Sequence, residues 1–568
     1  MVTKKTHRFV LTLVTVGLLW AALSLLQVVR ADSGTLFVAP GGSGSACSQS
    51  QPCLLQEALN KAVDRDTIYL AAGTYTGRGS AVITITKSIT VYCGWDGNAL
   101  GQPLRDPARY VSVIDGQGQR RGVYIFGPVR PTVDGCTITR GNASNGPDPG
   151  IGGGLYSLLA TPIIANNVVT GNVAYTSTTR SAMGGGMYVG SAGLGAAILG
   201  NHIAYNVAST SYAGSGGGLW VCTCPWITVA GNWVLHNTAS ATGGVGYGGG
   251  IGMGSSTYAL VDNNVIESNV AQGGPATAAG SWGGGLYAGA CGGMTMTNNL
   301  LRGNTASIPA TGQGGGACLD ACDGAKVAGN RLEGNVGCAS TSSAGAGRGG
   351  GFSTYASRRV AISANRVLSN TASLNAWGYG GGFYFSRNSS FTMTNNIVAA
   401  NHASFVGGAV AFETGATQPV TGTLVHNTVV GNDRGAGDGR IGIHLNKGWV
   451  TLAMTNNIIS RHTYGVYAVA GSTVTLRSTL FYANTSGDTG GPGRITNTAA
   501  LTGQDPLLNV NYHLSSGSPA IDAGVNAGVT TDIDGDPRPT GAGYDIGADE
   551  AQPSRRLYLP VLLRNLAS

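Results

Sequence analysis

Charged residues are scarce in this sequence of 568 residues: Asp, Glu, Lys and Arg together make up only 10% of it. Residues 151–260 contain no Asp or Glu at all. The formal net charge is +7, and it falls to +3 without residues 1–31, which hold four basic and no acidic side chains. A net charge this small, with no basic patch interleaved with aromatic residues, predicts no nucleic-acid partner.

Motifs that carry chemistry are also missing. The sequence has no nucleophile elbow, phosphate-binding loop or HExxH motif. Polysaccharide lyases and glycosidases need several carboxylates that converge on one face. Residues 151–440 hold only eight carboxylates, and the closest local pair is Asp320 and Asp323. The sequence therefore argues against a catalytic groove along this region and leaves open a site at an irregular end.

Long helical patterns are absent from the middle of the chain. Its apolar runs are short, such as LYSL and PIIANN, and fall below the roughly 10 to 12 residues of a typical helix. Glycine accounts for 94 residues, too many for an ordinary globule, yet no Gly-X-Y period indicates collagen. Short strands bounded by Gly and Asn turns fit this composition best.

What the sequence does contain is a repeat. Residues 152–172 read GGGLYSLLATPIIANNVVTGN, and related copies follow at steps of 27 to 35 residues until about residue 440. Such a period indicates a solenoid. Three short strands and three turns fit within one repeat, and the rest forms a loop such as YTSTTRSAM. We predict an all-β fold in which each repeat makes one coil of a parallel β-helix.

Each of the nine copies ends in two asparagines held five residues apart. Asn tolerates the left-handed backbone of a sharp corner, and its amide can bond the same amide one coil away. We predict a stacked ladder formed by the first asparagine of each pair: Asn167, Asn201, Asn232, Asn264, Asn299, Asn330, Asn365, Asn396 and Asn427.

Aromatic residues recur at one position of the repeat. After each glycine run one side chain should point inward and the next outward, as Leu155 and Tyr156 would. The aromatic residues in the outward series are Tyr156, Tyr188, Trp220, Tyr287 and Tyr384. A stripe of this kind would stack on sugar rings or dock a partner, and the alternative is a packing ladder covered by the long loops.

The N-terminal region indicates export. Residues 1–31 have a basic start, an apolar run and small residues before Asp32, as a signal peptide does; an uncleaved membrane anchor is the alternative. Apolar residues recur at helical spacing between Leu54 and Val63 and predict a short helix that caps the first coil.

The ten cysteines agree with export. We predict a local disulfide between Cys47 and Cys53. The spacing leaves the pairing of the later cysteines open, with cross-coil bridges as one option and a zinc site, which lacks His companions, as the other. The later cysteines are Cys222, Cys224, Cys291, Cys318, Cys322 and Cys338.

Several stretches resemble a known class of proteins. The runs DTIYLAAGTY from Asp66, CGWDG from Cys93 and VIDG from Val113 resemble the start of secreted bacterial right-handed parallel β-helix proteins of the pectate-lyase-like superfamily. The GG-hydrophobic openings and later Asn are similar to polymorphic outer membrane protein repeats. The runs YHLSSGSPAIDAG, DIDGDPRP and DIGADE look like a choice-of-anchor C-terminal module. The resemblance implies fold and export, and says little about activity.

The C-terminal region carries two further features. Asp532, Asp534 and Asp536 alternate as in calcium loops, so structural Ca²⁺ is one interpretation and an ordinary polar turn the other; we expect no other cofactor. Autotransported relatives end in a membrane barrel, for which the 18 residues after Glu550 are too few, so we expect no barrel of this chain's own.

These observations define six segments. The repeat motif, a glycine run followed by two asparagines five residues apart, is written GGG/Asn-x4-Asn. The segments are a signal peptide (1–31), an N-terminal cap with the first irregular coils (32–150), the nine-copy repeats (151–440), the last coils (441–500), a C-terminal cap module (501–550) and an apolar sorting or docking tail (551–568).

We expect a secreted or cell-surface monomer that acts as a non-catalytic scaffold or adhesin and binds extracellular glycans or neighbouring cell-surface proteins. The alternative function is that of a polysaccharide lyase or glycoside hydrolase of the pectate-lyase-like superfamily.

Overall fold

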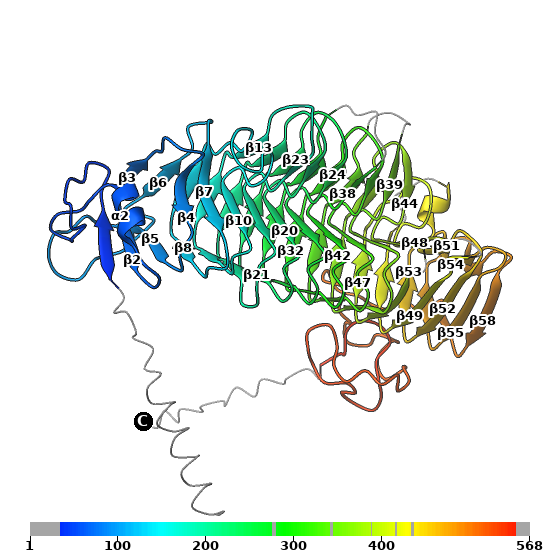
Figure 1. Cartoon of the computed structure of the whole chain (residues 1–568). Coiled ribbons are helices and arrows are strands. Elements are labelled where there is room, and N and C mark those ends of the chain that lie inside the picture. Colours follow the sequence, from blue (N-terminus) through cyan, green and yellow to red (C-terminus); the bar gives the residue numbers. More distant parts are fainter. Residues whose placement is uncertain are drawn as a thin grey trace, which may run out of the picture.

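A computed structural model of the chain describes residues 34–274, 280–340, 345–387, 389–414, 417–432 and 437–552. The predicted signal peptide and residues 553–568 of the predicted tail lie outside these ranges. The described chain forms a long stack of coils (Figure 1). Strands of neighbouring coils pair in parallel in sheets of 16, 15, 14, 7 and 7 strands, which confirms the parallel β-helix. The helices in the described ranges are α2 (Leu55–Lys61) and the 3-10 helix η1 (Gly437–Arg440).

The coil of residues 155–183 contains five strands rather than the predicted three. The loop expected after Ala174 contains the last of them and the end of the fourth, because the loops of successive coils pair with one another. The five strands are β10 (Leu155–Leu158), β11 (Ile163–Ala165), β12 (Val168–Thr170), β13 (Val173–Tyr175) and β14 (Ala182–Met183).

Each strand of this coil belongs to a different sheet, and the five sheets differ in how far they extend along the rod. The 14-stranded sheet of β10 runs from β4 (Ala81–Ile85) to β57 (Gly487–Gly490), the 16-stranded sheet of β11 from β1 (Thr35–Val38) to β58 (Arg494–Thr498), and the 15-stranded sheet of β12 from β3 (Gly73–Tyr75) to β59 (Leu501–Thr502). The seven-stranded sheets end at β43 (Thr371–Ser373) and β44 (Trp377–Tyr379).

The core is a continuous column of apolar side chains inside the three long sheets. Leu155 stands level with Met187 on the next coil, and Met187 with Leu219 on the coil after that. All three are fully buried. Burying a side chain of this size stabilises the fold by about 1.5–3 kcal/mol, and each coil obtains that burial only from its neighbours.

The glycine run has two separate physical roles. Gly152 has φ +64°, a left-handed conformation that other residues adopt at a cost. Gly153 lies where a Cβ would come within 2.5 Å of the carbonyl oxygens of Gly185 and Val173. The run therefore forms a sharp turn and lets two coils and the outer strand β13 approach closely.

Two ladders of asparagine side chains run along the interior. Asn167 donates from Nδ2 to Oδ1 of Asn201 on the next coil, at 3.0 Å, and to the carbonyl of Val133 on the previous coil, at 2.9 Å. A second ladder starts at Asn172, whose Nδ2 donates to Oδ1 of Asn206 at 2.9 Å. The first ladder contains all nine predicted asparagines and extends to Asn457: Asn201, Asn232, Asn264, Asn299, Asn330, Asn365, Asn396 and Asn427 follow Asn167.

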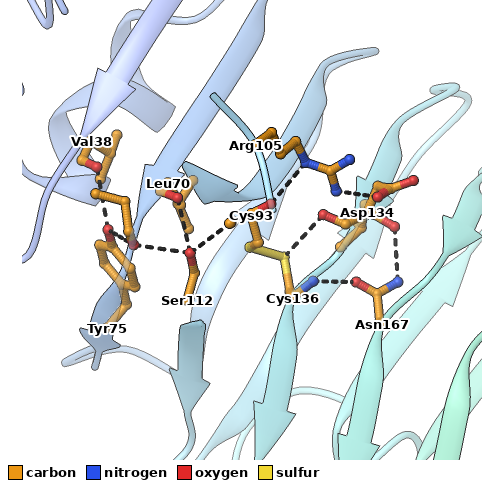
Figure 2. Close-up of a disulfide and its surroundings, with 12 residues drawn as sticks. Val38, Leu70, Tyr75, Cys93, Arg105, Ser112, Asp134, Cys136 and Asn167 are labelled. Carbon is orange, nitrogen blue, oxygen red and sulfur yellow. Dashed lines mark hydrogen bonds and ion pairs between the residues drawn. A yellow bond between two sulfur atoms is a disulfide. The ribbon is translucent and has the colours of Figure 1, made fainter. Parts of the chain in front are cut away.

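The N-terminal coils are closed by a helix and two disulfides. Helix α2 buries Leu55, Ala58 and Leu59 and contacts β1 and β4. Cys47 and Cys53 form the predicted disulfide. A second disulfide, between Cys93 and Cys136, joins two neighbouring coils (Figure 2).

The C-terminal module does not lie across the end of the rod, where we expected a cap. Residues 505–552 pack beside the last coils, against the outer face of the 15-stranded sheet (Figure 1). Ile533 and Ala548 contact β47 (Ile397–Ala399), and Ala520 and Ile546 contact the side chains of Ile458 and Leu480. Strand β58, in the last coil, stays largely exposed. The module therefore covers a side of the solenoid, because that face is apolar.

Candidate functional site

The residues of the predicted aromatic series occupy the same register position on successive strands of the 14-stranded sheet. Tyr156 is paired in register with Tyr188, and Tyr188 with Trp220. The rings of Tyr156 and Tyr188 stack with centroids 5.4 Å apart. The alternation of inward and outward residues therefore follows the glycine run as the sequence indicated.

This series is not an exposed stripe. Tyr156 and Tyr384 are only 2% exposed, and Trp220 and Tyr287 only 9%. The seven-stranded sheet that includes β14 lies over them: Met183, Tyr247 and Trp282 pack against Trp220 and Tyr287. The outer layer of loops thus covers most of the predicted ligand-binding residues, and Tyr287 and Tyr384 of the series line an opening.

That opening is a groove of about 550 Å³ between the outer layer and the 14-stranded sheet. Cavities of about 300–1,000 Å³ are typical of small-ligand sites. One wall is a column of side chains in register from four coils, and each comes from a strand of the outer layer. The column is Tyr247 on β24 (Gly246–Tyr247), Trp282 on β29 (Ser281–Trp282), Gln313 on β34 (Gly312–Gln313) and Arg348 on β39 (Ala346–Arg348).

The opposite wall is formed by the carboxyl ends of four strands of the 14-stranded sheet. Their last residues are level with one another. They are Asp320 of β35 (Ala317–Asp320), Tyr355 of β40 (Phe352–Tyr355), Ser386 of β45 (Phe383–Ser386) and Glu413 of β48 (Val410–Glu413).

The hollow arises where the aromatic series is interrupted. Between Tyr287 and Tyr384 the same register position holds Cys318 and Ser353. Both are small and fully buried. Two coils without a large ring at this position leave room that an aromatic side chain fills elsewhere along the rod.

Each carboxylate of the groove is bonded to a tyrosine of the preceding coil. The Tyr287 hydroxyl donates to Oδ2 of Asp320 at 3.2 Å, and the Tyr384 hydroxyl donates to Glu413. Burial raises the pKa of Asp320, and the bond from Tyr287 partly opposes that rise. Arg348 Nε lies 3.3 Å from Oε2 of Glu413.

The two carboxylates do not form an acid–base pair. They stand three coils apart, a distance of about 14 Å along the rod, whereas glycosidase pairs are about 5 to 10 Å apart. Each carboxylate accepts its hydrogen bond from a tyrosine of the preceding coil, so the distance between the two carboxylates stays at about three coils. Burial also raises the pKa of Tyr384 well above its usual value, so its hydroxyl stays protonated.

Several donors in the groove have no partner within the described part of the chain. Gln313 Nε2 is buried without a hydrogen bond, and so is Arg348 Nε, whose contact with Glu413 is an ion pair of poor hydrogen-bond geometry. Arg387 lies with Cζ 4.8 Å above the ring of Tyr355 and forms no ion pair with a described carboxylate. Buried donors without acceptors are costly, so these groups suit a ligand rich in oxygen atoms.

The predicted calcium loop is held by hydrogen bonds from its own backbone. Oδ1 of Asp532 accepts the backbone N–H groups of Asp534, at 2.9 Å, and Asp536, at 2.8 Å. In the described ranges, Asp534 instead belongs to a cluster with His513 and Asp549, whose ligand atoms lie within 4.8 Å of one another. Arg366 Nη2 already approaches Asp534 at 2.8 Å. The cluster thus already has a positive partner in Arg366, and this ion pair links the C-terminal module to the rod.

Sequence reasoning missed most groove residues, and one signal was available. Tyr247, Trp282, Gln313 and Arg348 all stand just before a glycine run, at Gly248, Gly283, Gly314 and Gly349. That fixed offset places them in register, as the structure does. The two carboxylates carry the same kind of signal, because Asp320 and Glu413 are each the fourth residue after the glycine run of their repeat, which ends at Gly316 and at Ala409.

Comparisons with known proteins agree with this architecture. Residues 246–438 match the family model described as "Right handed beta helix region". A comparison with curated protein sequences finds no match. The protein is a right-handed parallel β-helix of about 13 coils.

Similar solved structures include pectate lyase Pel9A, at 13% identity, covering 92% of this chain and 97% of that one, with a TM-score of 0.29. A PL6 alginate lyase in complex with a trisaccharide has 10% identity, coverage of 86% and 93%, and a TM-score of 0.37. PfbA, a surface adhesin of Streptococcus pneumoniae, has 8% identity, coverage of 77% and 84%, and a TM-score of 0.30. Scores this low carry no conclusion about activity.

Within the described residues, no helix is long and apolar enough to cross a membrane.

Proposed function

We propose that the protein is an extracellular glycan-binding scaffold or adhesin and that the groove between β24 and β48 is its binding site. One observation carries the proposal: Gln313, whose buried Nε2 has no hydrogen-bond partner among the described residues, and Arg348 stand in one column with the half-buried rings of Tyr247 and Trp282. Sugars present hydroxyl acceptors at their edges and apolar C–H groups on their faces, so both kinds of side chain suit them.

The charges of the groove suggest which glycans bind best. Glu413 is paired with Arg348, and Asp320 accepts a hydrogen bond from the Tyr287 hydroxyl. Arg387 therefore contributes a cation that the described residues leave without a carboxylate partner. Glycans that carry carboxylate or sulfate groups are expected to bind more tightly than their neutral counterparts.

An extracellular site is supported by the two disulfides, which form and persist mainly in oxidising compartments. Both join segments of the N-terminal coils. The signal peptide and the adhesive role remain our proposals, and the same holds for monomeric assembly.

The test is a panel of matched acidic and neutral polysaccharides, scored for binding by calorimetry and for cleavage by the release of new chain ends. Trp282→Ala and Gln313→Ala should each weaken binding about tenfold, the equivalent of roughly 1.4 kcal/mol. Trp226→Ala is the matched control, because Trp226 is 56% exposed and lies outside the groove.

Equal losses in Trp226→Ala and Trp282→Ala would contradict the groove as the site. Release of unsaturated or shortened sugars would instead support the function of a lyase or glycosidase.

A further inference from the structure

Two cysteines outside the disulfides, Cys291 and Cys322, occupy the same position on neighbouring coils. Strand β30 (Leu286–Gly289) pairs with β35, and Gly289 stands level with Asp320. The register continues into the turn, where the Cys291 N–H donates to Cys322 Sγ at 3.3 Å. Both side chains are fully buried in the core.

No other pair among the six free cysteines of the described chain stands in this relation. Cys222 and Cys224 lie two residues apart in one coil, and the coil of Ser256 separates Cys224 from Cys291. Cys318 stands in register with Tyr287 and Ser353 on the neighbouring coils. Cys338 stands in register with Ser307 and Ser373.

The spacing of neighbouring coils suits a disulfide. Adjacent strands lie about 4.8 Å apart, and disulfides join Cα atoms about 4.4–6.8 Å apart. The chain already contains an example: Cys93 and Cys136 are on neighbouring coils, 4.9 Å apart at Cα, and are bridged (Figure 2).

The chemical setting is also suitable. The two side chains are hydrogen-bonded to each other in the folded protein, which lowers the pKa of Cys291 and raises that of Cys322, so the two sulfur atoms stand face to face. The thiolate is the nucleophile in thiol–disulfide exchange.

We propose that Cys291 and Cys322 form a third disulfide, which links the coils of β30 and β35. The two thiols lose two protons and two electrons, and a disulfide of a thiol–disulfide oxidoreductase accepts them and becomes a dithiol. Exchange passes through a mixed disulfide with one cysteine, which the other then displaces. Because both sulfurs are buried, the reaction takes place before the coils close.

The bridge lies directly behind the groove. Cys322 Sγ is 3.4 Å from the carbonyl oxygen of Asp320, and the coil of Cys291 carries Tyr287, the partner of that carboxylate. A covalent link here would hold the Tyr287–Asp320 contact in place. The disulfide itself does not depend on what the groove binds.

The test uses the full chain secreted into an oxidising compartment and purified without reductant. It is denatured, alkylated and digested with trypsin and chymotrypsin. Cleavage after Tyr287 and Arg302 separates Cys291 from Cys222 and Cys224, and cleavage after Leu319 and Lys326 separates Cys322 from Cys318. Mass spectrometry should find four alkylated cysteines rather than six, together with a linked peptide pair that contains Cys291 and Cys322. Alkylation of both in protein whose other two disulfides are intact would overturn the proposal.

Serine variants provide controls that should fold. The same turn position holds Ser256 and Ser357, whose hydroxyls accept the N–H groups of Cys224 and Cys322 at 3.1 and 3.0 Å. Cys291→Ser should leave Cys322 alkylated, and Cys322→Ser should leave Cys291 alkylated. The double variant should melt several degrees below the oxidised wild type, because it lacks this one bridge and keeps the disulfides Cys47–Cys53 and Cys93–Cys136. A partner other than Cys322 in the linked peptide would also refute the pairing.

Discussion

At the scale of single residues, two adjacent residues have different roles at each corner that carries a ladder asparagine: one turns the backbone and the next forms hydrogen bonds to the neighbouring coils. The residue before a ladder asparagine takes the left-handed conformation, as Asn166 and Asn298 do with φ +55°. The ladder residue itself, such as Asn299, turns its side chain inward. The asparagine spacing located the ladder residues correctly, but we expected these same residues to take the left-handed conformation, which the residue before each of them takes instead.

A ladder residue should be far more sensitive than its neighbour. Asn299 Nδ2 donates to Asn330 and to the carbonyl of Val261, both at 2.9 Å, and its Oδ1 accepts two bonds from Asn264. Asn299→Ala would leave these buried groups unpaired and should cost about 3–5 kcal/mol. Chemical unfolding followed by tryptophan fluorescence measures the loss.

Asn298→Gly is the matched control for that variant. Asn298 is exposed, and glycine accepts its positive φ, so the midpoint of unfolding should shift little. Similar unfolding midpoints for Asn299→Ala and Asn298→Gly would show that the ladder contributes no special stability.

At the scale of elements, the strands of the long sheets were predictable and the outer layer was not. The glycine runs set the register that places Tyr156 beside Tyr188, so the aromatic series could be located from sequence. Its burial could not, because the covering strands lie in loops of variable length and composition. The groove depends on pairing between these loops, and Trp282 acquires its neighbours Tyr247 and Gln313 only there.

The C-terminal module is an element with a buried ion pair inside it. Arg538 Nη1 lies 2.7 Å from Oε2 of Glu550, and both side chains are fully buried. Arg538 also donates to the carbonyl of Gly547 at 2.8 Å. Glu550→Ala would leave a buried cation without its partner and should cost about 3–5 kcal/mol. Proteolysis should then cut residues 505–552 while the coils stay resistant.

The contrasting variant is Glu57→Ala in helix α2. Glu57 pairs with Lys61 at 3.8 Å on the surface, where such pairs contribute about 0.5 kcal/mol or less. This protein should resist protease as the wild type does. A protease-resistant module in Glu550→Ala would mean that the apolar contacts hold it without the ion pair.

At the scale of the whole molecule, the coils are similar in shape, but acid is expected to change the stability of some coils more than that of others. Three buried histidines, His426, His444 and His462, all lie in the last third of the coils. His462 continues the second asparagine ladder: its Nε2 accepts the N–H of Asn432 at 3.2 Å, and its own N–H donates to Asn484 at 3.2 Å. Burial lowers the pKa of these histidines to about 3, 4 and 3.

These shifts predict that acid destabilises the C-terminal coils first. A histidine with a folded pKa of about 3 and an ordinary unfolded pKa binds its proton mainly in the unfolded chain, so stability falls as the pH drops from about 6.5 toward 3. Each should cost about 2 kcal/mol at pH 5. Asp545 acts in the opposite direction, because burial raises its pKa to about 6 and the folded state then takes up its proton first. The histidines outnumber it, so the net effect is a loss.

His462→Asn isolates this effect, because asparagine occupies the ladder position on the coils before and after, at Asn432 and Asn484. The variant should keep the ladder bonds, lose one acid-sensitive group and retain about 2 kcal/mol more stability than the wild type at pH 5. Apparent Tm measured by circular dichroism between neutral pH and pH 5 gives the comparison, with hydrogen exchange locating the first coils to open. Parallel pH curves for the two proteins would show that His462 does not titrate on unfolding, and early exchange at the N-terminal coils would contradict the predicted order.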